Sequence, residues 1–257
     1  MANELPEDLE TEILLWLPVA SLLRFKCVCK PWYAVINHQN FRRKHFLRNN
    51  NKNSNTLLLK TTRGCVVSTH SYETFQVSRT QHLPPPYPLR VLGGREAEIY
   101  VAGSCNGLVC LHDSDALCVV IWNPATNETK VVPKSYLPRN APAGYRTTIE
   151  SMGFGFDAKT NDYKIINVRS FRHPSIIQSE NIFQTEVYSL SADSWRKVDG
   201  PPCLKYDRFE RPRKYINGMA SCQPRGVDWE GVLSFDMSHE VFLKTLLPDD
   251  LIAYVSS

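Results

Sequence analysis

Apolar residues near the start of the chain recur with the spacing of a helix. Leu9, Ile13 and Leu17 fall four residues apart, and Leu14 widens the same stripe. Side chains with this spacing share one face of an α-helix, whereas a strand would place successive residues on opposite faces. The pattern predicts an amphipathic helix whose apolar face is buried against a neighbour.

Proline and serine positions divide the first 48 residues into three predicted helices. Pro6 suits the first turn of a helix, and Pro18 ends the first helix because it cannot continue it. Ser21 is the predicted N-cap of a second short helix, which Pro31 ends. A third helical stretch is predicted from Trp32 towards Phe46.

A polar break over residues 49–55 separates this region from one with a different pattern. Beyond it, short apolar runs alternate with turn residues, and no helical pattern intervenes, which favours a sandwich, barrel or propeller of β-strands. An extended loop is expected at residues 84–88. Strands are predicted at 56–60, 65–68, 99–102, 108–111, 118–122, 129–132, 152–156, 163–168, 185–190, 195–198, 232–235 and 240–243.

Two segments of the β region are loosely alike. One starts at Gly107 and the other at Gly153, and each ends in a strand pair around a polar turn. A third unit is predicted from Ile216 to Lys244. Units of about 40–50 residues with four short strands are typical of kelch-like propeller blades. About two and a half units are expected here, fewer than the roughly 4–8 of a closed propeller, so we predict an incomplete, shortened member of that architecture.

The composition of the chain indicates the cellular compartment and the kinds of partner to expect. Hydrophobic residues make up 42% and charged residues 22%, as in ordinary globular proteins, and the formal charge of +4 does not favour a nucleic-acid partner. The N-terminus lacks the pattern of a signal peptide, and no apolar run approaches membrane-spanning length. We therefore expect a soluble protein of the cytoplasm or nucleus, with its eight cysteines as free thiols.

Two cysteine patterns are candidates, one for a catalytic site and one for a metal site. Cys105 lies in a Gly-x-Cys-x-Gly sequence, and with His112 and Asp113 it is a candidate hydrolase site. Asn106-Gly107 is instead a signal for a type I′ hairpin, and this is the favoured interpretation. Cys27 and Cys29 lack the second pair that a zinc site needs, so no metal or cofactor is expected.

Two further features have a structural and a functional interpretation. The basic run 41–48 is more often the solvated face of a helix than a nuclear-import or nucleic-acid patch. Tryptophans in blade-like strands more often pack in the core than line a ligand groove, so a core role is the favoured interpretation of Trp122, Trp195 and Trp229.

The N-terminal sequence resembles an F-box. The resemblance rests on Leu-Pro-Glu-Asp-Leu at 5–9, Leu-Pro-Val at 17–19 and Ser-Leu-Leu-Arg-Phe-Lys-Cys-Val-Cys-Lys-Pro-Trp at 21–32. The later sequence resembles the F-box-associated domain of plant F-box/kelch-repeat proteins, through Ser-Cys-Asn-Gly-Leu-Val-Cys-Leu at 104–111, Ile-Trp-Asn-Pro-Ala-Thr at 121–126 and Gly-Phe-Gly-Phe-Asp at 153–157.

The resemblance implies an α+β multidomain protein with three parts. They are a three-helix F-box at 1–48, a linker with first strands at 49–98, and an incomplete kelch- or propeller-like β domain at 99–257. The sequence departs from the family pattern in two places. Family members usually have a Trp-rich stretch near the position of Gly218, where this chain has Met-Ala-Ser-Cys-Gln-Pro. They also usually continue beyond the stretch that matches Leu-Ser-Phe-Asp at 233–236.

The function implied is that of a non-enzymatic substrate receptor in an SCF ubiquitin ligase. The F-box would dock on a Skp-family adaptor and through it reach cullin and the RING/E2 module, while the β domain would bind an unidentified protein substrate through loops at 136–148 and 169–180. Two alternatives are a β-propeller-like scaffold without a ligase role and a shortened protein that binds adaptor but not substrate. The residues predicted to bind the adaptor are Leu5, Pro6, Leu9, Ile13, Leu14, Leu17, Pro18, Leu22, Val28 and Trp32.

Overall fold

The protein folds into two compact units, Met1–Pro86 with Pro124–Glu128, and Tyr87–Asn123 with Thr129–Ser257. The computed structural model describes residues 5–50, 56–60, 66–71, 77–82, 99–113, 118–135, 146–172, 182–201, 208–216, 218–225 and 231–246. The predicted loop at 84–88 lies outside these residues. The predicted division at residues 48 and 98 stays a prediction.

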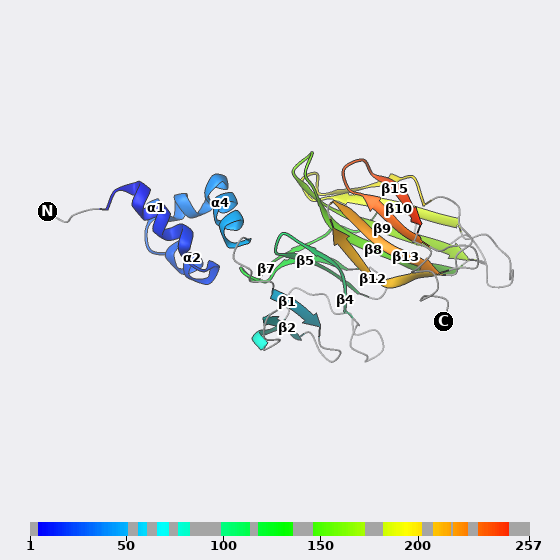
Figure 1. Ribbon diagram of the computed structural model, residues 1–257, viewed down its shortest axis with the longest axis horizontal. Helices are drawn as coiled ribbons and strands as arrows, with labels where there is room; N and C mark the ends of the chain where they lie inside the picture. The colour runs from blue at the N-terminus through cyan, green and yellow to red at the C-terminus, as the bar shows by residue number, and fades with distance from the viewer. Residues whose placement is uncertain are drawn as a thin grey trace. The chain divides into compact units, whose positions relative to one another are not determined.

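The N-terminal region forms four helices, not the three predicted. They are α1 (Glu7–Trp16), α2 (Val19–Phe25), α3 (Lys30–Asn37) and α4 (Gln39–Asn50), drawn in blue in Figure 1. The expected third helix is divided at His38, whose ψ of 135° is extended. Ser21 lies inside α2, which starts directly after Pro18, so the predicted N-cap was wrong. Pro31 lies in the first turn of α3, where its missing N–H has no helical partner to lose.

Antiparallel sheets make up the rest of the described chain. Strands β1 (Thr56–Lys60), β2 (Val66–Ser71) and β3 (Val77–His82) form a three-stranded sheet. Three four-stranded sheets follow, and in each the strands are ordered as in the sequence. The first is β4 (Ile99–Cys105), β5 (Leu108–Asp113), β6 (Val119–Asn123) and β7 (Glu128–Val131). The second is β8 (Arg146–Asp157), β9 (Asp162–Arg172), β10 (Ile182–Ser189) and β11 (Ser194–Val198). The third is β12 (Arg208–Ile216), β13 (Met219–Arg225), β14 (Gly231–Asp236) and β15 (Val241–Leu246).

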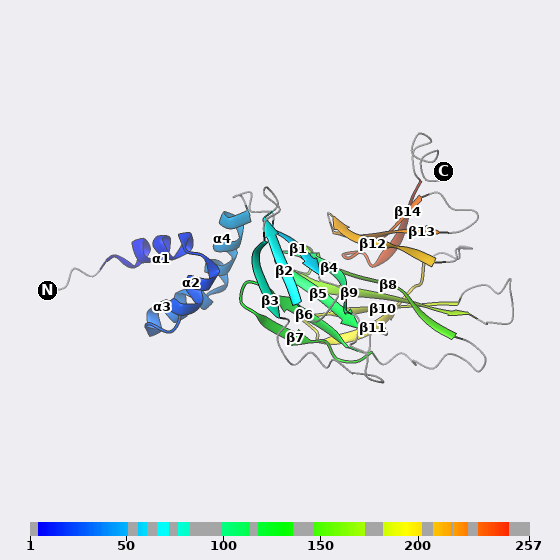
Figure 2. The same ribbon diagram turned by 90° about the horizontal axis from the view of Figure 1, so that it is seen from below.

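The first strands of the three four-stranded sheets lie against one another: β8 contacts both β4 and β12, and β12 also contacts β4. Figure 2 shows the third sheet, in orange, beside the long green strand β8. This is the arrangement of propeller blades, in which each sheet is a four-stranded meander whose first strand is innermost. The described strands form no closed barrel, and the predicted α+β class with a propeller-like β domain is confirmed.

Twelve strands were predicted near their observed positions, but β3, β12 and β13 were not. β12 is rich in charged residues and contains Pro212, so it lacks the apolar alternation that marks a strand. Its pairing with β13 shifts register between Glu210 and Lys214, as expected where a proline interrupts a ladder. With these strands the third unit is complete, and the described chain has three four-stranded units instead of two and a half.

The turns between strands repeat one conformation. In four of the described hairpin turns, the residue directly before the second strand has a φ between 49° and 60°; these residues are Asn127, Asn161, Asp193 and Glu240. The β4–β5 hairpin turns at Asn106-Gly107, with φ of 49° and 79°, which confirms the predicted type I′ turn.

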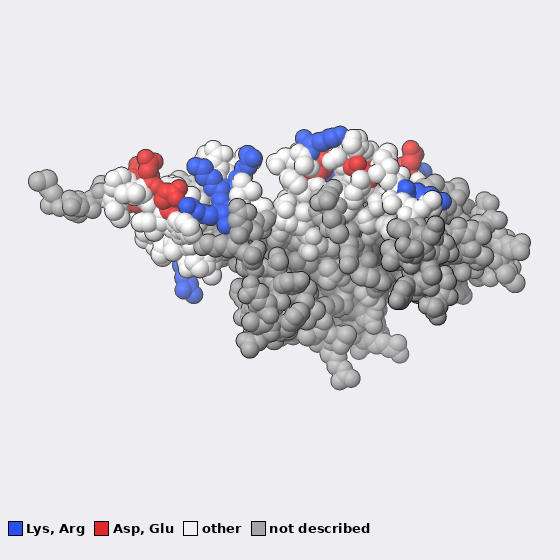
Figure 3. Space-filling view, in the orientation of Figure 1, with Lys and Arg blue, Asp and Glu red and all other residues white. Residues whose placement is uncertain are grey.

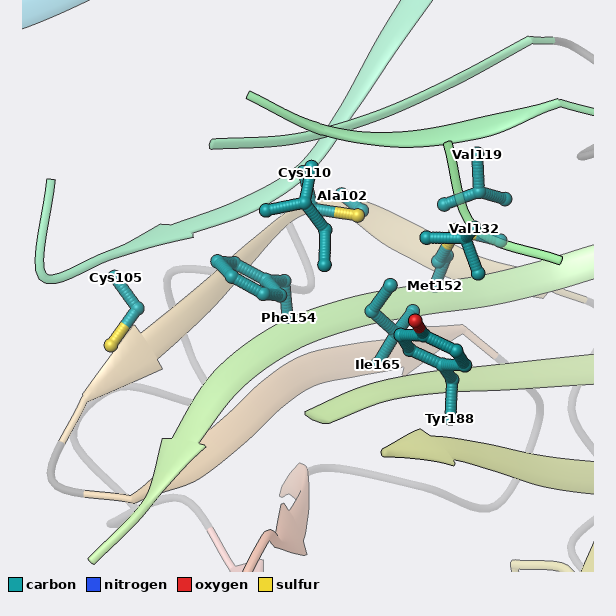
Figure 4. Packing of buried hydrophobic residues seen from close by; sticks show 10 residues of the cluster. Ala102, Cys105, Cys110, Val119, Val132, Met152, Phe154, Ile165 and Tyr188 are labelled. Carbon is teal, nitrogen blue, oxygen red and sulfur yellow. The ribbon is translucent and has the colours of Figure 1, made fainter. Parts of the chain in front are cut away.

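Two hydrophobic cores hold the four-stranded sheets together. Between the first and second sheets, Cys110, Met152, Phe154 and Ile165 are buried, and Figure 4 shows these side chains interleaving. Between the second and third sheets, the buried residues are Ile166, Val168, Val187, Leu233, Phe235 and Met237. The second sheet approaches β13 so closely that a Cβ on Gly153 would lie 2.9 Å from the Cβ of Ala220.

The tryptophans of the β domain that are described have packing roles. Trp122 is fully buried. Trp195 is partly buried against the first core, and its indole N–H donates to the Pro133 carbonyl at 2.6 Å. These positions agree with the predicted core role, and Trp229 lies outside the described residues.

A buried ionic network also joins the second and third sheets. The Lys164 ammonium donates to Asp157 Oδ2 at 2.7 Å, to the Met237 carbonyl at 2.8 Å and to Glu240 Oε1 at 2.8 Å. The Ser238 hydroxyl donates to Asp157 Oδ1 at 2.5 Å. The Lys164 side chain is 7% exposed and that of Asp157 is not exposed at all. Each buried charge is therefore stabilised by the other, because water cannot solvate it.

This network should make the fold acid-sensitive. Burial by itself would raise the pKa of the Asp157 carboxyl, but hydrogen bonds from Lys164, Ser238 and Thr160 outweigh it and hold that pKa well below its usual range. A carboxylate with a lowered folded-state pKa contributes stability that is complete above its unfolded pKa, about 3.9, and is lost as the pH falls through its folded pKa. We expect the free energy of unfolding to fall below pH 4, and to fall less steeply in Asp157→Asn. Urea unfolding at a series of pH values measures both slopes, and equal slopes would contradict the assignment.

Candidate docking surface on the helical bundle

Helix α1 has two apolar faces. Leu14 and Leu15, each 2% exposed, point into the bundle. Leu9, Ile13 and Trp16 are 53%, 52% and 55% exposed. Positions 9, 13 and 16 lie within about 60° of one another on a helical wheel, on the side away from positions 14 and 15. α1 therefore carries an unburied apolar face, which we call the α1 stripe and define as Leu9, Ile13 and Trp16.

The bundle has its own core beneath α1. Buried Leu14, Leu15, Leu22, Ile36 and Phe41 form it, with Leu17, Phe25, Trp32 and Val35 partly buried against it. This core does not include the α1 stripe, whose side chains stay half exposed on the surface of the bundle.

Polar contacts fix α1 on its neighbours. The Trp32 indole N–H donates to Glu10 Oε2 at 3.0 Å, which ties α3 to α1. His45 Nε2 lies 2.9 Å from the Leu17 carbonyl oxygen, which ties α4 to the end of α1. The orientation of the α1 stripe is therefore set by the bundle.

The structure divides the residues predicted to bind the adaptor into three groups. Six are exposed: Leu5, Pro6, Leu9, Ile13, Pro18 and Val28. Leu17 and Trp32 are partly buried at the edge of the bundle core. Leu14 and Leu22 are buried in it, where they support the surface, and their contact with an adaptor stays a prediction.

Three exposed apolar residues were not predicted as part of the site: Trp16, Tyr33 and Leu47 are 55%, 58% and 53% exposed. Trp16 had a signal in the sequence, because it lies seven residues after Leu9 and so on the same helical face. Trp16 therefore extends the apolar face of α1 as an interaction surface, whereas Tyr33 lies on α3 and Leu47 on α4, outside the α1 stripe.

Charge is divided between the helices. All four ionisable residues of α1, namely Glu7, Asp8, Glu10 and Glu12, are acidic, whereas α4 has only basic ones. Figure 3 shows acidic side chains over α1 and basic ones over α4. Arg42, Arg43 and Lys44 are exposed, in agreement with the predicted solvated face of the basic run.

The candidate hydrolase site is not assembled. Cys105 pairs with Leu108 in the β4–β5 hairpin, and His112 lies four residues further along β5, which corresponds to roughly 13 Å. A nucleophile and its base must lie within hydrogen-bonding reach. His112 Nδ1 contacts the carbonyl oxygen of Asp113 instead, while the Asp113 carboxylate accepts from the Cys118 backbone N–H at 3.1 Å.

The described residues also give no support for a metal site or a membrane-spanning helix. In the described part of the chain, no three His, Cys, Asp or Glu side chains are grouped so as to hold a metal ion. Cys27 and Cys29 are exposed thiols. No helix in the described ranges has the length and apolar character needed to cross a membrane. Of the loops predicted to bind substrate, residues 136–145 and 173–180 lie outside the described residues, whereas residues 146–148 belong to β8 and residues 169–172 to β9.

Comparison with known proteins agrees with both parts of the fold. Residues 3–44 match the F-box domain family, and residues 56–250 match the family described as F-box associated beta propeller domain. The chain is 29% identical over 254 residues to the F-box/kelch-repeat protein At3g23880 of Arabidopsis thaliana, which covers 93% of this chain and 64% of the relative. It is 27% identical over 202 residues to the F-box protein CPR1 of Arabidopsis thaliana, which covers 76% of this chain and 45% of the relative.

The helical bundle and the propeller-like sheets each match a known protein family. The chain belongs to the F-box proteins that carry an F-box-associated β-propeller domain. It spans less than two thirds of the length of the two relatives described above.

Proposed function

We propose that this protein is a substrate receptor of an SCF-type ubiquitin ligase. In this proposal the helical bundle docks on a Skp-family adaptor, which connects it to cullin and the RING/E2 module, and the β domain holds a protein substrate. The F-box and F-box-associated families support this role in general. The cytoplasm or the nucleus, where such ligases could act, is the proposed location.

The observation that carries the proposal is the α1 stripe. Its three side chains are large, half-exposed and fixed on one helical face by a bundle whose core is already filled. A standard interface buries about 800 Å² per partner and draws most of its energy from a few central apolar or aromatic anchors. The stripe supplies such anchors on an ordered helix, so little conformational entropy is lost on binding.

The proposed mechanism needs no nucleophile from this chain. Binding adaptor and substrate together raises the effective concentration of substrate lysines near the E2 thioester. The chain would contribute positioning, and the reaction would take place on its partners.

A reconstitution experiment tests the proposal. Tagged full-length protein is expressed in plant cells with proteasome inhibitor, purified and incubated with E1, E2, ubiquitin and ATP. We expect adaptor and cullin to co-purify and ubiquitin conjugates to form on associated proteins, with both lost in a Leu9→Asp/Ile13→Asp variant. Well-folded protein that recovers neither adaptor nor cullin would overturn the proposal and favour a scaffold without a ligase role.

A further inference from the structure

Trp16 occupies the C-terminal end of the α1 stripe and is held there by α4. The Arg48 guanidinium lies over the Trp16 indole, with its Cζ 4.0 Å from the ring centroid. The same guanidinium donates from Nη1 to Glu12 Oε2 at 2.9 Å. Glu12 precedes Trp16 by one helical turn, so Arg48 contacts two adjacent positions on the surface of α1.

This contact restricts the indole without burying it. A guanidinium stacks flat on an aromatic ring and can at the same time donate to a carboxylate, which fixes its own plane. The contact with Arg48 therefore favours one orientation of the Trp16 ring, although the residue is 55% exposed. A large side chain that is ordered before its partner arrives loses less rotamer entropy on binding, and tryptophan is among the residues enriched in interface hot spots.

The surroundings of the stripe indicate what kind of surface covers it. Helical geometry places Asp8 and Glu12 along one side of the stripe and Glu10 along the other. Glu12 is already paired with Arg48 and Glu10 accepts from Trp32, so the complementary partner is a protein groove recognised mainly by its apolar floor. Because Trp16 is continuous with Leu9 and Ile13, the occupant is the adaptor of the proposed function.

We infer that Trp16 is an anchor of the adaptor interface and that Arg48 is a positioning residue that holds its indole ready for binding. The inference rests on the proposed function. Arg48 lies beyond residues 3–44, the stretch that matches the F-box family, so the family match assigns it no role.

Calorimetric titration of the full-length protein with a purified plant Skp-type adaptor tests the inference. Trp16→Ala should weaken the affinity about 30-fold, as for an interface hot spot. Tyr33→Ala, which removes an equally exposed aromatic outside the stripe, is the matched control and should change it less than about 3-fold. Circular dichroism establishes that both variants are folded, and Trp16→Phe, expected to lose an intermediate amount, replaces Trp16→Ala should that variant unfold.

A double-mutant cycle tests the role of Arg48. Arg48→Ala should weaken binding about 2–5-fold in the wild-type background but not further in Trp16→Ala, because it acts through the indole. Arg48→Lys should retain part of the affinity. Additive losses would overturn the positioning role, and a Trp16→Ala variant that binds like the control would overturn the anchor role while leaving the proposed function intact. Failure of the wild-type protein to bind would overturn the proposed function itself, and the inference with it.

Discussion

Replacing Lys164 with methionine is expected to lower the free energy of unfolding by about 3–5 kcal/mol. Lys164 donates to Asp157, Glu240 and a backbone carbonyl within the interface between the second and third sheets. The substitution keeps most of the side-chain volume but leaves the buried Asp157 carboxylate without its ammonium partner. Removing one partner of a buried ion pair lowers the free energy of unfolding strongly, because the other charge is left buried without compensation. Replacing both partners by apolar residues costs much less.

Urea unfolding followed by circular dichroism measures this effect, and the protein supplies its own control. Lys130 pairs with Asp193 at 2.8 Å, but both side chains are about half exposed. Lys130→Met should therefore shift the unfolding midpoint only slightly, because water replaces the lost partner. If Lys164→Met shifted the midpoint no more than Lys130→Met, the buried network would have no special part in joining the sheets.

The second large effect is expected on adaptor binding. The double substitution Leu9→Asp/Ile13→Asp should reduce adaptor affinity at least about 100-fold, since it places charge at two central apolar anchors. Both side chains are half exposed, so the bundle itself should keep its thermal stability. Leu47→Asp, at another half-exposed leucine on α4, is the matched control and should bind normally.

The structure also shows which substitutions are poor tests of docking. Leu17 and Trp32 are partly buried against the bundle core, and Leu14 is fully buried in it. A charge at Leu14 would unfold the bundle and abolish binding for a reason unrelated to the surface. The docking hypothesis would be contradicted if Leu9→Asp/Ile13→Asp, folded and thermally stable, bound the adaptor as tightly as wild type.

Much of the fold was predictable because local signals agreed with it. Pro6 and Pro18 stand just outside the ends of α1, and Asn106-Gly107 forms the expected hairpin turn. The division of the third helix at His38 carried no such signal, because neither proline nor glycine stands there. β12 was missed because tertiary pairing with β13 outweighs its poor strand pattern.

The docking surface was only partly predictable. Periodicity identifies positions on one helical face, but it does not tell a buried face from an exposed one. Leu14 and Ile13 are adjacent apolar residues with opposite environments, and only the packing of the other helices separates them. The clamp of Arg48 on Trp16 joins residues 32 positions apart, and no local pattern could have predicted it.

The measurement that tests the central claim most directly is the mass of the complex in solution. Full-length protein is mixed with a purified plant Skp-type adaptor and analysed by size-exclusion chromatography with light scattering. The account predicts a one-to-one complex with the wild-type protein and separate components with Leu9→Asp/Ile13→Asp. Folded wild-type protein that elutes apart from the adaptor at micromolar concentrations would contradict the assignment of the α1 stripe as an adaptor-docking surface.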